Sequence, residues 1–125
     1  MDTVSVRYIV ADVDEAIGFY VGLLGFTVEM HPGKGFAALR LGSLRLFLNA
    51  TGGEGGASHA MPDGSVPEPG GWNRIQLPAD DLDADVARLR EAGAAFRNEI
   101  VQGIGGRQIL LQDPSGNLVE LFEKG

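Results

Sequence analysis

The sequence predicts an α+β fold made of two βαβββ modules. The main support is an internal repeat: a strand, a capping aspartate and a helix recur at an offset of 69 residues, which superposes Asp12 on Asp81. In both copies the helical pattern is followed by short segments in which apolar and polar residues alternate, as in half-buried strands. With 125 residues, the chain is long enough to bury a core of its own. We therefore expect one structural domain, with modules at 1–49 and 72–125.

The first module contains a strong helix signal. Asp12 precedes an apolar stripe that includes Ile17 and Tyr20, and it is an N-cap candidate with Glu15 three residues later, as in a capping box. Gly25 ends the helix, because glycine readily adopts the left-handed conformation that follows many helices. These signals predict a strand at 3–11, a helix at 13–24, and strands at 26–31, 36–41 and 44–49, with turns at Pro32-Gly33 and Gly42-Ser43.

The second module repeats this order and ends in a hairpin. Asp81 is its N-cap candidate, and Gly93 is the glycine that ends its helix. The turn at 113–117, Asp-Pro-Ser-Gly-Asn, contains a proline that presets one dihedral angle, and a glycine and an asparagine that tolerate positive φ. The pattern predicts a strand at 72–78, a helix at 82–92, and strands at 95–101, 107–112 and 118–123.

Residues 50–71 join the modules and differ from both in composition. The segment holds seven glycines and three prolines, which makes it too polar and too rich in glycine for a core element. A loop of this length in a small domain is either a linker or a lid over a site, and both interpretations remain open. Met61 within the segment and Trp72 directly after it give the lid interpretation some support.

Composition excludes several classes of function. The chain has no cysteine, which rules out a disulfide framework and a thiolate metal site. Seventeen acidic residues against ten basic ones leave a net charge of −7, so we expect no nucleic-acid partner. No apolar run reaches the length of a membrane span, and the N-terminus lacks the pattern of a secretory signal. We expect a cytoplasmic protein with no membrane partner.

At the level of motifs the chain resembles the vicinal oxygen chelate superfamily, which includes the glyoxalase I, bleomycin-resistance and extradiol-dioxygenase families. The resemblance rests on the paired modules, the Asp-Val/Leu-Asp helix starts, Phe19-Tyr20 before Leu24-Gly25-Phe26, and the terminal Asp-Pro-x-Gly-Asn-x-x-Glu-Leu, and it covers nearly the whole chain. It implies a curled mixed sheet around a concave cleft, with the helices outside. It does not specify a function, because these folds include isomerases, lyases, dioxygenases and non-catalytic drug binders.

The resemblance also implies positions for metal ligands. In the metal-dependent relatives, four side chains from the first and fourth strands of each module hold one divalent ion. The corresponding positions in this sequence are Ser5, Arg45, Arg74 and Glu120. Only Glu120 is a usual ligand, because a guanidinium offers hydrogen-bond donors and no lone pair. We therefore expect neither a metal ion nor another cofactor.

The same strand faces carry polar and aromatic residues that suit a ligand. We expect Glu120 to lie within reach of Arg74, with Arg45 as a second candidate partner, so that a guanidinium–carboxylate pair replaces the metal as organiser of the cleft. The alternative is that this pair only fills a vestigial site. Aromatic residues on the same face favour a pocket. The predicted ligand-binding residues are Ser5, Arg7, Arg45, Phe47, Trp72, Arg74, Gln76, Glu120 and Phe122.

Two classes of function remain open. The first is metal-independent binding of a small aromatic or oxygen-rich molecule, anionic or quinonoid, in a sequestration role similar to that of bleomycin-resistance proteins. The second is a lyase or isomerase of the glyoxalase type that uses Glu120 as general base, with arginines stabilising an oxyanion. Arginines near a carboxylate weaken it as a base, which favours binding. Relatives with two such modules usually dimerise, so the expected partners are a small-molecule ligand and a second copy of the chain.

Overall fold

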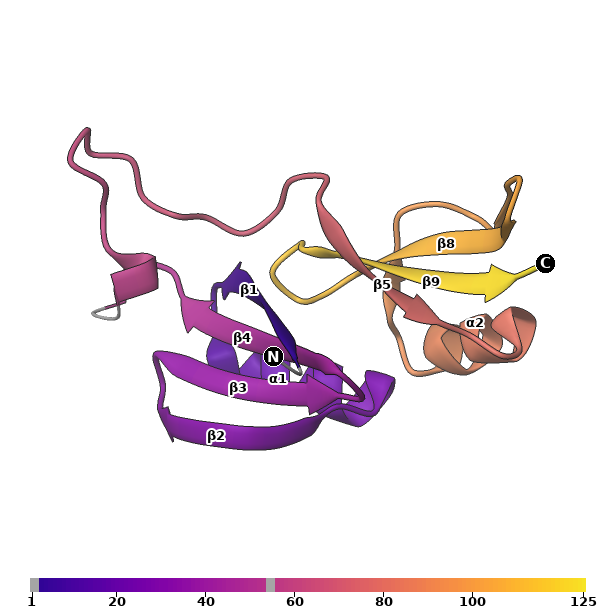
Figure 1. Ribbon diagram of the computed structural model, residues 1–125, viewed down its shortest axis with the longest axis horizontal. Helices are drawn as coiled ribbons and strands as arrows, with labels where there is room; N and C mark the ends of the chain where they lie inside the picture. The colour runs from indigo at the N-terminus through magenta and orange to yellow at the C-terminus, as the bar shows by residue number, and fades with distance from the viewer. Residues whose placement is uncertain (1–2, 54–55) are drawn as a thin grey trace. The chain divides into compact units, whose positions relative to one another are not determined.

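The computed structural model describes residues 3–53 and 56–125. The chain divides into two compact units, Met1–Gly70 and Gly71–Gly125. Each unit carries one curled, mixed sheet and one long helix, with the same order of strands and helix in both (Figure 1). The predicted α+β class and the internal repeat are therefore confirmed. Neither long helix has the length and apolar character needed to cross a lipid bilayer in the part of the chain that the structure describes.

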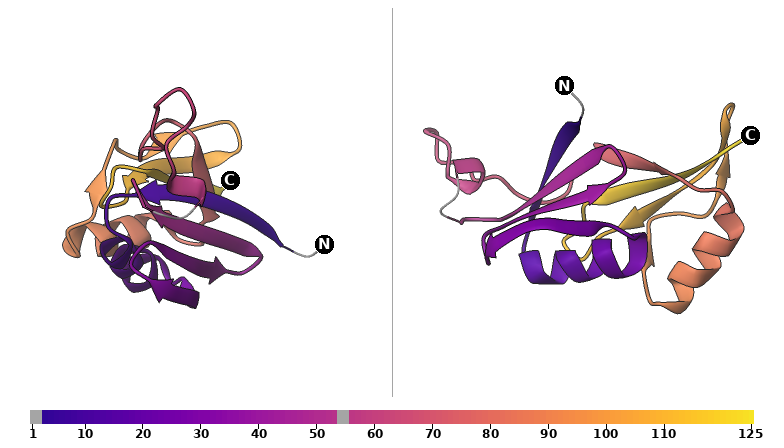
Figure 2. Two further views of the ribbon diagram at one scale, coloured as in Figure 1. Left: turned by 90° about the vertical axis from the view of Figure 1, so that its left-hand side faces the viewer. Right: turned by 60° about the horizontal axis from the view of Figure 1, so that its bottom comes forward.

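The sheet of the first unit has the strand order β1-β4-β3-β2. β1 (Val4–Val10) and β4 (Leu44–Ala50) pair in parallel, and β3 (Phe36–Leu41) and β2 (Thr27–Gly33) continue the sheet in antiparallel fashion. A parallel pair needs a crossover connection, which α1 (Val13–Leu24) supplies. The helix lies along one face of this sheet (Figure 2).

An aromatic cluster fills the space between α1 and its sheet. Tyr20 is fully buried, and its ring centroid lies 4.9 Å from that of Phe19, 5.5 Å from that of Phe26 and 6.5 Å from that of Tyr8. The edge-to-face arrangement of the first two pairs is the one that aromatic quadrupoles favour. Tyr8 of β1 thus lies on the side of the sheet that faces α1, where it meets Tyr20 of the helix.

The second unit repeats this topology. Its sheet begins with β5 (Arg74–Pro78), which pairs in parallel with β9 (Leu118–Lys124), and β9 pairs antiparallel with β8 (Gly106–Gln112). Helix α2 (Leu82–Glu91) again provides the crossover and covers one face (Figure 2). Its apolar stripe is buried at Leu82, Val86 and Leu89.

The single strand predicted at 95–101 is wrong. The structure has two short pieces instead, β6 (Ala95–Phe96) and β7 (Val101–Gln102), and both pair with β8. Between them the Asn98 side chain accepts a hydrogen bond from the Leu110 backbone N–H at 2.9 Å, in the place of a strand carbonyl. A side chain that takes over a ladder hydrogen bond interrupts the strand, because it offers the backbone a local alternative.

The ends of both helices agree with the sequence signals. Asp12 and Asp81 each accept a hydrogen bond from the backbone N–H three residues later, at 3.0 Å and 3.1 Å. Gly25 ends α1 with a φ of 80°, and Gly93, with a φ of 85°, follows the cap of α2 at Ala92. Because Asp12 and Asp81 occupy the same N-cap position in the two modules, they define how the sequences of the modules align.

The turn before β9 also forms as predicted. The Asp113 carboxylate accepts hydrogen bonds from the backbone N–H groups of Ser115 at 2.8 Å and Asn117 at 2.9 Å. Gly116 has a φ of 90°, whereas no residue other than glycine has positive φ in the described part of the chain. Positive φ is therefore needed at the glycine of this turn and not at Asn117.

The turn between β2 and β3 lies two residues later than predicted. Pro32 and Gly33 belong to β2, and Lys34 and Gly35 make the turn. β2 is the edge strand of its sheet, so the missing N–H of Pro32 does not break a ladder. Turn signals mark a proline near a bend but cannot show on which side of the bend it lies.

The joining segment is tied back to its own unit. After β4 the chain forms the short 3-10 helix η1 (Gly56–Ser58), and the Thr51 hydroxyl donates to the Pro67 carbonyl at 3.0 Å. A local turn is closed by the Met61 N–H, which donates to the Ser65 carbonyl at 2.7 Å. In its described residues the segment is therefore held by contacts within the first unit.

An ionic cluster joins α2 to its sheet. Glu123 accepts a hydrogen bond from the backbone N–H of Leu82 at 2.8 Å, and Arg107 bridges Glu123 and Asp83 at 2.8 Å and 2.9 Å. The Leu82 N–H and the Arg107 guanidinium lower the pKa of Glu123, and the Arg107 hydrogen bond lowers the pKa of Asp83. The helix start is thus held by a second carboxylate besides that of its N-cap.

Candidate functional site

The first unit presents cations and an aromatic ring on the face of its sheet opposite α1, here called the helix-distal face. Strand alternation assigns Ser5 and Arg7 of β1 and Arg45 and Phe47 of β4 to this face. The parallel register places Ser5 opposite Arg45 and Arg7 opposite Phe47. Leu46 and Leu48, which alternate with these residues in β4, are fully buried on the other face. Four of the predicted ligand-binding residues are therefore neighbours.

Phe47 is the centre of this group. The guanidinium carbons of Arg7 and Arg45 lie 5.3 Å and 5.1 Å from the centroid of its ring, within the range of cation–π attraction. The ring of Phe36, from β3, lies 5.6 Å away at an angle of 57°. We call these four side chains the Phe47 platform. It combines a stacking surface with two permanent positive charges.

The two arginines of the platform differ in their ion pairing. Arg45 donates to Glu29 at 2.9 Å, and Arg40 donates to the same carboxylate at 2.7 Å. The hydrogen bonds from Arg40 and then Arg45 lower the pKa of Glu29. Arg7 has no carboxylate partner within residues 3–53 and 56–125. Arg7, Arg40 and Arg45 together with Glu29 have a nominal charge of +2. Of the two guanidinium groups next to the Phe47 ring, that of Arg7 is the one without a carboxylate partner among the described residues.

In the second unit Glu120 forms the expected pair with Arg74. Its side chain is 7% exposed, and one carboxylate oxygen accepts from Arg74 Nε at 3.1 Å and Nη2 at 2.9 Å. The other oxygen accepts from Gln76 Nε2 at 2.6 Å. Gln76 lies directly opposite Glu120 in the parallel register, which explains the short contact. Both oxygens of Glu120 are therefore engaged.

The remaining two predicted residues lie near this network. Trp72 is 68% exposed, its carbonyl accepts from Arg74 Nη1 at 3.4 Å, and its ring lies under the guanidinium of Arg97 at 5.3 Å. The strand predicted at 72–78 begins only at Arg74 in the structure, so Trp72 precedes β5 and is not part of it. Phe122 is half-buried in β9, opposite Pro78. The sequence did not predict Arg97 as a site residue, although it is a cation that lies next to the only tryptophan of the chain.

The cross-strand register shows that Arg45 is not the counterpart of Glu120 in the first module, contrary to what the sequence alignment of the modules had implied. The capping aspartates align Arg7 with Gln76, and these face Phe47 and Glu120 respectively. Phe47, and not Arg45, therefore corresponds to Glu120. The four matched positions become Ser5, Phe47, Arg74 and Glu120, which include one carboxylate and one hydroxyl. Within residues 3–53 and 56–125 no group of three or more His, Cys, Asp or Glu side chains could hold a metal ion.

Sequence reasoning missed Glu29 and Arg40, and the reason is a bulge. The pairing of β2 with β3 shifts register between Val28 and Met30, so Glu29 is the extra residue. A bulge breaks the alternation from which a side chain's face is predicted, and no residue pattern in β2 announces it. Arg40 lies opposite Arg45 in the antiparallel pair, so strand pairing would have found it. Glu29 then separates two like charges.

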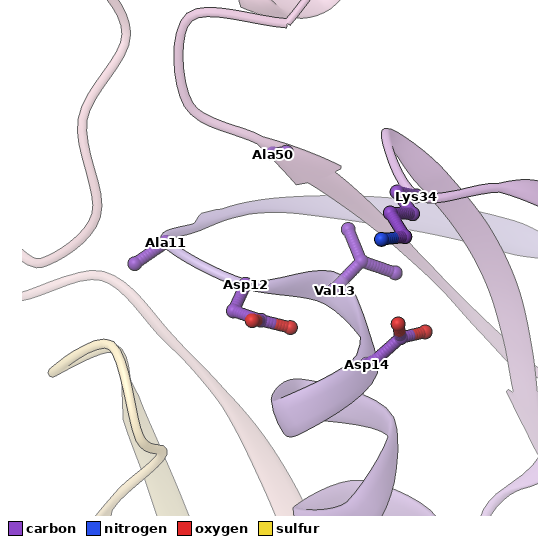
Figure 3. Close-up of a pocket in the computed structure, with 6 residues that line it drawn as sticks. All are labelled: Ala11, Asp12, Val13, Asp14, Lys34 and Ala50. Carbon is purple, nitrogen blue, oxygen red and sulfur yellow. The ribbon is translucent and has the colours of Figure 1, made fainter.

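A separate cleft of about 210 Å³ opens at the start of α1 (Figure 3). Asp12 caps the helix there, and Asp14 pairs with His31 Nε2 at 3.2 Å. None of the predicted site residues lines it, and its acids already have local partners. The residues around the cleft are Ala11, Asp12, Val13, Asp14, Lys34 and Ala50.

The fold is shared by many solved structures. TnmS3, described as an antibiotic binding protein from Streptomyces sp. CB03234, is 27% identical over 100% of this chain and 97% of its own, with a TM-score of 0.75. A superfamily member from Sphaerobacter thermophilus is also 27% identical over 98% and 96%, with a TM-score of 0.75. Lactoylglutathione lyase from Agrobacterium tumefaciens, at 21% identity over 95% and 90% and a TM-score of 0.74, shares the fold.

The sequence itself also has a family match. No curated protein sequence matches the chain significantly. The family model described as the Glyoxalase/Bleomycin resistance protein/Dioxygenase superfamily matches residues 3–121, nearly the whole length. The match includes both capping aspartates and the turn before β9, and it ends within β9. The chain therefore belongs to the glyoxalase/bleomycin resistance protein/dioxygenase superfamily.

Proposed function

We propose that this protein binds a planar aromatic small molecule with an anionic or oxygen-rich group, and that it does so without a metal ion and without changing the molecule. The observation that carries the proposal is the Phe47 platform, in which Arg7 has no carboxylate partner among the described residues and its guanidinium lies 5.3 Å from the centroid of an aromatic ring. The ring offers stacking surface, and the guanidinium offers charge-assisted donors to a carboxylate or phenolate. Residues that only filled a vestigial site would need neither a stacking surface nor a charged donor.

The donor set supports independence from metal. At the four matched positions, a hydroxyl, a phenyl ring and a guanidinium accompany one carboxylate. A divalent cation needs several oxygen, nitrogen or sulfur lone pairs, which a phenyl ring and a guanidinium do not supply. The carboxylate is moreover bound to Arg74 and Gln76 through both oxygens. A bound cation would have to break these contacts and would be repelled by the arginine.

The same contacts argue against the enzymatic alternative. A general base needs an oxygen that can reach the proton it abstracts. The Oε1 atom of Glu120 accepts from two Arg74 nitrogens and the Oε2 atom accepts from Gln76, so a proton could be taken only after one of them moves away. The likeness to TnmS3, an antibiotic binding protein at 27% identity, supports sequestration as the biological role.

The test is a binding titration with a defined probe. We expect 2-naphthoate to bind by isothermal titration calorimetry, and Arg7→Gln to weaken it about tenfold, the low end for a hydrogen bond to a charged group because Arg7 is exposed. The matched control is Arg90→Gln. Arg90 also lies 5.3 Å from a phenylalanine centroid, that of Phe96, but on the surface of α2 with Glu99 as its partner. This variant should bind the probe as the wild type does.

Two further measurements complete the test. The neutral 2-naphthamide should bind the wild type and Arg7→Gln equally, because it lacks the charge that Arg7 recognises. Glu120→Gln should keep the affinity for 2-naphthoate within about threefold, since an amide retains the shape and one acceptor. If 2-naphthoate fails to bind at millimolar concentration, or if Arg7→Gln and Arg90→Gln behave alike, the proposal is wrong.

A further inference from the structure

Asn49, in β4, carries a buried acceptor that none of the described residues uses. The residue is 5% exposed, and its Oδ1 atom has no hydrogen-bond partner in the described part of the chain. Buried polar atoms in native proteins are nearly always paired, and an unpaired one opposes folding. By contrast, the Oδ1 atom of Asn98 accepts the Leu110 N–H at 2.9 Å. The acceptor of Asn49 therefore calls for a role outside the folded chain itself.

The strand register places Asn49 at the end of the Phe47 platform. Asn49 and Phe47 are two residues apart in β4 and share the helix-distal face, about 6.6 Å apart along the strand. Asn49 lies opposite Phe36 in the antiparallel pair and opposite Ile9 in the parallel pair. Because the Phe36 ring also contacts the Phe47 ring, an aromatic body stacked on the platform would lie between Asn49 at one end and Arg45 at the other. The Oδ1 atom has almost no accessible surface, so a ligand donor reaches it only when the side chains that cover it move aside.

We propose that Asn49 is the specificity-determining residue of this site, and that it accepts a hydrogen bond from a hydroxyl or N–H group of the ligand. The inference rests on the proposed function and narrows the ligand class. The ligand is an aromatic anion that carries a donor at the end of its long axis opposite the anionic group. The donor satisfies the Oδ1 atom while the anionic group meets the arginines.

The test compares three probes of nearly the same shape by isothermal titration calorimetry. 6-Hydroxy-2-naphthoate carries the donor, 6-methoxy-2-naphthoate carries only an acceptor, and 2-naphthoate carries neither. We expect the wild type to bind the hydroxylated probe about fivefold more tightly than the other two, the effect of one neutral hydrogen bond. Asn49→Leu should bind all three probes within about twofold of one another. Equal binding of the three probes by the wild type would overturn the inference without any variant.

A stability measurement separates this role from a structural one. Asn49→Leu removes an unpaired acceptor and keeps the number and branching of the side-chain heavy atoms, so its melting temperature should equal or exceed that of the wild type. Asn98→Leu is the matched control, and its melting temperature should fall because the Leu110 N–H loses its acceptor. A fall of similar size in Asn49→Leu would show a structural role and overturn the inference. If 2-naphthoate binds with its dependence on Arg7 but the hydroxyl group adds nothing, the proposed function stands and this inference fails. If no naphthoate binds, both fail.

Discussion

Replacing Arg74 by methionine should destabilise the protein by leaving a buried carboxylate without its cation. Glu120 is 7% exposed at its side chain, and Arg74 supplies two of the three hydrogen bonds that it accepts. Breaking a fully buried ion pair costs about 3–5 kcal/mol. Arg74 is 28% exposed, so water can enter where the guanidinium was, and we expect a loss of about 2 kcal/mol in the free energy of unfolding.

The double-mutant cycle gives this prediction its control. In Arg74→Met/Glu120→Leu both charges are replaced by apolar groups of similar size, and the free energy of unfolding should stay within about 1 kcal/mol of the wild type. Glu120→Leu alone should cost less than Arg74→Met alone, because the exposed guanidinium can return to water whereas the carboxylate cannot. Urea denaturation followed by far-UV circular dichroism measures all four proteins. If Arg74→Met costs less than about 0.5 kcal/mol, or if the double variant is no more stable than Arg74→Met, the reasoning about this pair is wrong.

Three further predictions concern acid, metal and assembly. The pKa values of Glu123 and Asp83 lie below their ordinary values of 4.5 and 3.8, so both carboxylates stabilise the fold when they are charged. That stability is lost as the pH falls below about 4.5. Between pH 7 and pH 3 the melting temperature should therefore fall less for Glu123→Gln than for the wild type, and equal falls would contradict this. Protein purified without added metal should hold less than one divalent ion per chain and keep its melting temperature in chelator, and one tightly held equivalent by elemental analysis would refute metal independence. Light scattering at micromolar concentration should give twice the 13.2 kDa chain mass, because each sheet has edge strands, such as β1 and β5, that need a partner, and a monomer would exclude the homodimer.

Local chemistry in the sequence predicted much of the fold. The aspartate caps, the glycines that end the helices and the turn before β9 depend on residues close together in the chain, so their signals can be read without the tertiary structure. Alternation likewise assigned Arg7, Arg45 and Phe47 to one face of their sheet, because side chains of a strand point to opposite faces in turn. The pair between Arg74 and Glu120 followed from the repeat and from the cost of burying a lone carboxylate.

Only the tertiary structure decided how these side chains are paired. The sequence left Arg45 as a candidate partner of Glu120, whereas the bulge in β2 brings Glu29 to Arg45. The register of β4 against β1 matched Phe47 to Glu120, and the burial of Asn49 showed an acceptor that no pattern marks. A bulge or a change of register reassigns every cross-strand neighbour beyond it, so these pairings are set by contacts between strands and not by the residues of any one strand.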